Sequence, residues 1–134
     1  MQVDKRNDMM NWTFRGLDAT GQKGWVYGDL THNQKVTRTG LEPRVMVGGY
    51  EVVPESVSLC TGIKDKDGTM IYEGDIVRVS YNGKDLFDAT IVWLNRYGGF
   101  YMDEEDEKCY SPIPNKSVTV IGNVYEQGVK DKRE

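Results

Sequence analysis

The residues that decide the fold are Cys60–Val77, which read CTGIKDKDGTMIYEGDIV. Turn signals at Gly62, at Asp67–Gly68 and at Glu73–Asp75 separate short apolar pieces of this stretch. Glycine is favoured where the backbone takes a positive φ, and Asp-Gly favours a tight turn between strands. The apolar run Ile76–Tyr81 follows directly. We therefore predict a compact corner that leads into a series of antiparallel strands.

Length and charge limit the classes of protein to which this chain can belong. With 134 residues it is long enough to fold as one domain around its own core. The net charge is −4, and residues 63–134 account for all of it, because they carry ten basic and fourteen acidic side chains. An acidic balance argues against binding to a phosphate backbone and is usual for a solvated surface.

Cysteine usage and hydropathy indicate a cytosolic protein. The two cysteines, Cys60 and Cys109, have no CxxC spacing and are too few for a disulfide framework. The first residues lack the apolar segment of a secretory signal, so we expect a cytoplasmic chain with reduced thiols and Cys60 in the core. No apolar run reaches the roughly 18 residues of a transmembrane helix, which predicts no membrane contact.

The first half of the chain has the pattern of β-hairpins. Residues 12–30 alternate large and polar side chains on either side of a polar break, which predicts one hairpin. Thr31–Pro43 is polar and aperiodic, and we expect a loop there. Gly48–Gly49 supplies both central positions of a turn that would join a second pair of strands. Pro54–Leu59 is compatible with a single helical turn.

The second half predicts a meander of short strands. Asn82–Gly83 is a strong hairpin signal, although the next apolar strand restarts only near Phe87. Ala89–Leu94 is apolar on both faces, which predicts a central strand. The acidic run 103–107 is expected to be exposed, and Val118–Tyr125 forms the last strand, with a bulge at Gly122.

These patterns together predict a mainly β protein with little helix. We expect one domain over residues 12–126, in which the N-terminal hairpins of 12–62 pack onto a small SH3-like barrel of 63–126. A flexible N-terminal tail is predicted over residues 1–11 and a charged C-terminal tail over residues 127–134.

The two carboxylates on either side of Gly74 are the candidates for an enzyme. Glu73 and Asp75 could face the same way, but a paired-carboxylate mechanism needs an apolar pocket that separates their pKa values. The sequence shows no such pocket. We expect instead that their oxygens accept hydrogen bonds from nearby backbone N–H groups and so fix the corner. The only histidine, His32, has no apparent partner for a metal site or a nucleophilic dyad.

Aromatic residues leave a second possibility open. On a barrel face they could stack bases, but phosphate binding also needs basic residues between them. The candidates for that role are Arg15, Lys23, Arg78, Lys84 and Arg96. We expect most rings in the core and a few in a protein-contact patch. The rings in question are Trp12, Phe14, Trp25, Tyr27, Tyr72, Tyr81, Trp93, Phe100 and Tyr101.

Three stretches resemble the YopX-like proteins of phages and prophages. The central motif Thr61–Val77 is similar to the signature of that family. Phe14–Asp18 resembles the start of the family, where Ala-Trp more often replaces Gly16–Leu17, and Val120–Glu126 resembles its end. The resemblance covers residues 12–126.

The resemblance implies a small, phage-borne, intracellular protein that self-assembles, with no assigned catalysis and no known cofactor. We therefore expect a non-catalytic accessory protein in the bacterial cytoplasm, acting as a homo-oligomer on a host or phage protein. Nucleic-acid binding by the barrel is the alternative, and an enzyme built on Glu73 and Asp75 is the third hypothesis. The candidate binding residues of the corner are Lys64, Asp65, Asp67, Tyr72, Glu73 and Asp75. We expect no metal ligands.

Overall fold

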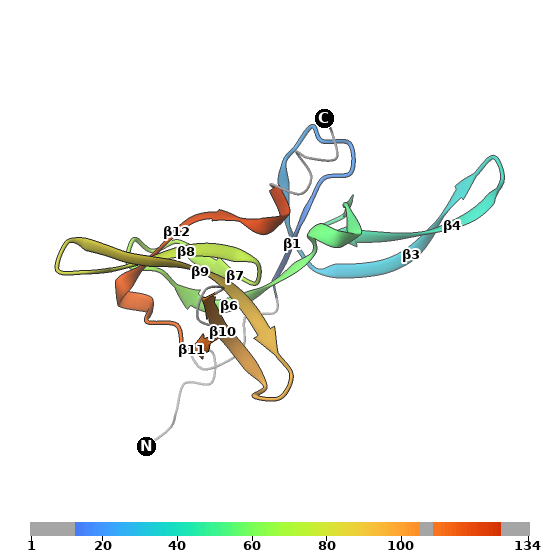
Figure 1. Ribbon diagram of the computed structural model, residues 1–134. Helices are drawn as coiled ribbons and strands as arrows, with labels where there is room; N and C mark the ends of the chain where they lie inside the picture. Colours follow the sequence, from blue (N-terminus) through green and yellow to red (C-terminus); the bar gives the residue numbers. More distant parts are fainter. Residues whose placement is uncertain (1–12, 105–108, 127–134) are drawn as a thin grey trace, which may run out of the picture.

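A computed structural model describes residues 13–104 and 109–126, and it is mainly β, as predicted (Figure 1). The predictions for the two tails and for the exposure of residues 105–107 lie outside these ranges. The strands are β1 (Phe14–Leu17), β2 (Trp25–Gly28), β3 (Leu30–Thr37), β4 (Gly40–Val47), β5 (Tyr50–Glu51), β6 (Ser58–Lys64), β7 (Met70–Tyr72), β8 (Asp75–Tyr81), β9 (Lys84–Leu94), β10 (Gly99–Glu104), β11 (Cys109–Ser111) and β12 (Val118–Asn123). Two 3-10 turns, η1 (Pro54–Ser56) and η2 (Asn115–Ser117), interrupt them.

The strands form three antiparallel sheets. Their orders are β2-β1-β6-β7, β3-β4-β5 and β11-β10-β9-β8-β12. Ala89–Leu94 lies in β9, the middle strand of the five, so the prediction of a central strand is confirmed. The described strands show no pairing that closes the five-stranded sheet on itself, and the SH3-like barrel stays a prediction.

The N-terminal hairpins form around a small core of their own. β1 pairs with β2, which confirms the hairpin predicted for residues 12–30. Gly48 and Gly49 connect β4 to β5 with φ of 59° and 87°, the conformation that a primed turn requires. Val26, Val47 and Val52 form the core of this part.

The predicted loop over Thr31–Pro43 is wrong. These residues belong to β3 and β4, which pair in unbroken register from Leu30 opposite Val47 to Thr37 opposite Gly40. The two strands project from the body as a long ribbon (Figure 1). Because both faces of the ribbon meet solvent, the alternation of apolar and polar residues that predicts a half-buried strand is absent.

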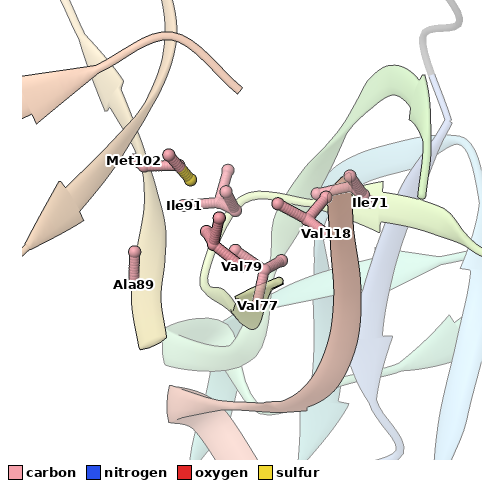
Figure 2. Close-up of a cluster of buried hydrophobic side chains, with 7 residues drawn as sticks. All are labelled: Ile71, Val77, Val79, Ala89, Ile91, Met102 and Val118. Atoms are coloured by element: carbon pink, nitrogen blue, oxygen red, sulfur yellow. The ribbon is translucent and has the colours of Figure 1, made fainter. Parts of the chain in front are cut away.

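The main core lies within the five-stranded sheet and β7 (Figure 2). Its members are Ile71, Val77, Val79, Ala89, Ile91, Met102 and Val118. Asn82 and Gly83 form the turn between β8 and β9 with φ of 51° and 76°. β9 begins at Lys84, three residues before the predicted position. The apolar pattern missed these residues because Lys84 and Asp85 are polar and exposed. The bulge predicted at Gly122 is confirmed by a shift of register between Val120 and Gly122.

The corner at Asp65 is held by its own side chain. Oδ1 of Asp65 accepts hydrogen bonds from the N–H groups of Asp67 and Thr69, and Oδ2 accepts one from Val120 of β12. Burial raises the pKa of this carboxyl, but the hydrogen bonds outweigh burial and lower the pKa below its usual value. The carboxylate therefore ties the turn between β6 and β7 to β12.

Candidate functional site

A buried ion pair joins the N-terminal sheet to the five-stranded sheet. Arg15 of β1 places Nη2 at 2.6 Å from Oδ1 of Asp75, the first residue of β8. Nε of Arg15 donates to Oγ of Ser58 on β6 at 2.9 Å. All three side chains are buried. The pair therefore links three strands that are up to 60 residues apart in the sequence.

Two aromatic rings enclose the guanidinium of Arg15. Its Cζ lies 4.4 Å from the ring centroid of Trp25 and 4.7 Å from that of Tyr72. The second oxygen of Asp75, Oδ2, accepts the backbone N–H of Tyr72 at 2.8 Å. This bond confirms the expectation that Asp75 fixes the corner. Burial raises the pKa of Asp75, and the adjacent Arg15 guanidinium opposes that shift.

An apolar pocket of about 610 Å³ opens next to this ion pair. It lies between β1, the start of β6 and the hairpin of β9 and β10. Its lining residues are Phe14, Val57, Ser58, Leu59, Glu73, Trp93, Gly98, Gly99 and Phe100. Its volume is that of an ordinary small-ligand site, and one carboxyl group among apolar side chains gives it a polar point of attachment.

Glu73 is the one ionisable residue among these lining residues. Its Oε2 accepts the hydroxyl hydrogen of Tyr125 at 2.6 Å, a side-chain donor where the sequence suggested backbone N–H groups. Burial raises the pKa of Glu73, while the Tyr125 hydrogen bond and the charge of Arg15 act in the opposite direction. Burial and the Glu73 carboxyl also raise the pKa of Tyr125.

The raised pKa of Glu73 gives a testable dependence of stability on pH. A carboxyl whose folded pKa is raised stabilises the protein below its unfolded pKa, and this contribution is lost as pH rises through the folded pKa. Glu73→Gln is neutral throughout. We therefore expect the Glu73→Gln variant, in dilute solution, to have a higher free energy of unfolding than the wild type at pH 7. The difference should vanish below pH 4.5, the ordinary pKa of a glutamate side chain. Urea titrations across this range measure it, and a difference independent of pH would contradict it.

Aromatic residues gather on the hairpin of β9 and β10, and two of them, Trp93 and Phe100, line the pocket. Trp93 stacks edge-on against Phe100 with centroids 5.1 Å apart, and Tyr97 lies 5.5 Å from Tyr101. The guanidinium of Arg96 lies over the ring of Tyr97. Tryptophan, tyrosine and arginine are the residue types that contribute most to binding in protein interfaces.

The structure does not bring the six predicted binding residues together. Asp65 and Asp67 lie against β12, where Thr119 donates to Asp67. Tyr72 and Asp75 belong to the buried Arg15 cluster, and Lys64 is exposed at the end of β6. Of the six, only Glu73 lines the pocket.

Sequence reasoning missed Val57, Leu59 and the glycines at 98 and 99 as pocket residues. The sequence singles out Phe14, Trp93 and Phe100 only as members of the general set of aromatics. The pocket forms between strands about 40 residues apart, so no local spacing could reveal it. The one available signal was a run of aromatics on both sides of the Gly98–Gly99 turn.

Most of the basic residues considered for nucleic-acid binding are already engaged. Arg15 is buried against Asp75, and Arg78 donates two hydrogen bonds to the carboxylate of Asp88. Lys23 lies over the ring of Tyr50. Within the described ranges, no group of three or more His, Cys, Asp or Glu residues could hold a metal ion. No helix among the described residues has the length and apolar character needed to cross a bilayer.

Fold and site together define a small, mainly β protein with an apolar pocket. The chain belongs to the YopX family, because the family model described as YopX protein matches residues 3–129. A solved structure, that of protein EF1440 from Enterococcus faecalis, shares the fold with a TM-score of 0.52 and 22% sequence identity. The match covers 90% of this chain and 97% of that one. A comparison with curated proteins gave no match.

Proposed function

We propose that this protein is a non-catalytic interaction module that acts as a homo-oligomer and binds protein through the pocket of β1, β6 and the β9–β10 hairpin. The observation that carries the proposal is the pocket itself, with an exposed aromatic margin. Trp93, at its margin, is 46% exposed, although a monomer gains from covering so large a ring. An apolar centre surrounded by a polar rim is the usual form of a protein interface.

The carboxylates support a non-catalytic role. Asp75 is fully buried, with one oxygen bound to Arg15 and the other to the N–H of Tyr72, so a substrate cannot reach it. Glu73 faces the pocket without a second acid or base among the lining residues. A paired-carboxylate reaction would need both carboxyl groups to face the same bound substrate.

The resemblance to phage and prophage proteins supports an accessory role in the bacterial cytoplasm. On this proposal the pocket and its aromatic margin form contacts with copies of the chain and with a host or phage protein. Nucleic-acid binding is the alternative, and Arg96 over Tyr97 is the feature that favours it.

Replacing Trp93 with serine tests the role of the pocket. We expect Trp93→Ser to lose most of the protein captured by the tagged wild type from a bacterial lysate, because the ring forms the pocket margin. Tyr81→Ser is the matched control, since Tyr81 is also an exposed ring, 67% accessible, but lies at the far end of β8.

The same capture run with nuclease separates the two hypotheses. Partners that persist with nuclease and depend on Trp93 support the protein-interaction module. Partners that disappear with nuclease, or equal capture by Trp93→Ser and wild type, would contradict it.

A further inference from the structure

The ribbon of β3 and β4, residues 30–47, is built as an arm. Its base is anchored, because Val47 is fully buried and Leu30 packs against the N-terminal core. From there the two strands extend away from the body (Figure 1). At the strand rise of about 3.3 Å per residue, the paired segments reach roughly 25 Å. An isolated two-stranded ribbon is marginal in water, so an arm of this kind gains from a partner.

The tip of the arm carries an apolar pair. Val36 is 84% exposed and Leu41 is 63% exposed, and the two lie directly opposite each other in the register. Directly opposed residues place their side chains on the same face of the ribbon, about 5 Å apart. The two side chains therefore form one small apolar knob at the end of the arm.

The charge of the arm is opposite to that of the body. Residues 30–47 carry three basic side chains and one acidic side chain, whereas residues 63–134 carry the whole net charge of −4. Lys35 of the arm is already paired with Glu51. Arg38 is exposed in the turn at the tip, next to the apolar pair. The tip thus presents apolar surface beside a cation.

The pocket has the complementary chemistry, since its walls are apolar and its single charged group is the Glu73 carboxyl. We propose that the arm tip of one copy occupies the pocket of a second copy, with Val36 and Leu41 between Phe14, Trp93 and Phe100 and with Arg38 directed at Glu73. This inference rests on the proposed function, because it identifies the occupant of the pocket as a second copy of the chain.

The contact is between molecules, because the arm of a given copy points away from its own body (Figure 1). It joins two different surfaces, the tip of one copy and the pocket of the next. A contact of this head-to-tail kind gives a closed ring when the rotation between copies closes, and a filament when it does not.

Sedimentation equilibrium of the full chain tests the inference through two variants. Val36→Thr with Leu41→Thr removes the apolar knob while keeping strand-forming residues at exposed positions. Trp93→Ser removes the pocket margin and leaves the arm intact. We expect each variant to weaken self-association at least tenfold. Leu86→Thr, at an exposed apolar residue of β9 away from both surfaces, is the control and should associate like the wild type.

Mixing the two variants gives the sharper result. The tip variant retains an intact pocket and the pocket variant retains an intact arm, so the mixture can form one native contact per pair. We expect the mixture to form heterodimers with near wild-type affinity, although neither variant associates alone. The ion pair is tested by a double-mutant cycle, in which Arg38→Gln weakens association of the wild type severalfold and has no further effect on Glu73→Gln.

The outcomes separate this inference from the proposed function. A wild-type chain that stays monomeric at all concentrations would overturn both the homo-oligomer and the arm contact. An oligomer that survives the tip and pocket variants would overturn the arm contact alone. Loss of association in both variants without recovery on mixing would show that the arm binds a surface other than the pocket, which also overturns the inference.

Discussion

Asp75→Ala is expected to lower the free energy of unfolding by about 3–5 kcal/mol, the usual cost of breaking a buried ion pair from one side. The variant leaves the guanidinium of Arg15 buried between Trp25 and Tyr72 without its counter-charge. It also removes the acceptor of the Tyr72 backbone N–H. Denaturant unfolding at pH 7 measures the effect.

Asp88→Ala is the matched control for this prediction. Asp88 also binds an arginine, Arg78, through two hydrogen bonds, but both side chains are exposed. Exposed pairs contribute little because water solvates the separated charges. The change at Asp88 should therefore cost much less than the change at Asp75. Equal losses at the two positions would show that burial does not determine the contribution of the Arg15 pair.

Gly74→Ala is expected to destabilise the protein by about 2–5 kcal/mol, the sum of a left-handed backbone and a steric overlap. Gly74 has a φ of 87°, and a Cβ there would overlap the ring of Tyr125. The same ring donates its hydroxyl to Glu73. Thermal or denaturant unfolding measures the loss.

Gly68→Ala separates the two contributions. Gly68 has the same φ of 87°, but nothing lies within 4 Å of the Cβ position. It should lose only the backbone contribution of about 1–2 kcal/mol. Replacing Tyr125 with alanine should make Gly74→Ala less damaging, because the overlap is then removed. A Gly74 loss no larger than that of Gly68 would contradict the packing of Tyr125 on the corner.

The sequence predicted those elements of the fold whose signals are local. The turns at Asn82–Gly83 and Gly48–Gly49 have positive φ at both central positions. Asparagine and glycine tolerate this conformation, so these residue pairs predict a turn from the local sequence alone. Ala89–Leu94 is apolar on both faces, a pattern that predicts a central strand, and it lies in the middle strand of the five-stranded sheet. These elements therefore followed from a few neighbouring residues.

The arm and the Arg15 cluster could not be predicted in this way. Thr31–Pro43 lacks the alternation of a strand because the ribbon meets solvent on both faces, and strand formation there depends on the register of the whole hairpin. Arg15 is a charged residue in a short alternating strand. Only its approach to Asp75, 60 residues away, shows that it is buried. Both features depend on tertiary contacts that local periodicity does not contain.

The candidate site could be predicted only in part, because it also depends on tertiary contacts. Glu73 was identified from its place in the corner motif, and the structure places it in the pocket. Asp75, its neighbour in the motif, points into the buried ion pair instead. The turn at Gly74 separates the two side chains, so one carboxylate became a feature of the pocket and the other a part of the core.

Hydrogen–deuterium exchange at increasing protein concentration tests the central claim most directly, because it locates the surface that self-association covers. We predict that backbone amides of residues 93–100 and of the arm tip, 36–41, become more protected as concentration rises. Exchange at the turn between β8 and β9, residues 81–86, should not change with concentration. Protection confined to other strands, or exchange that does not depend on concentration, would contradict the pocket as the contact surface.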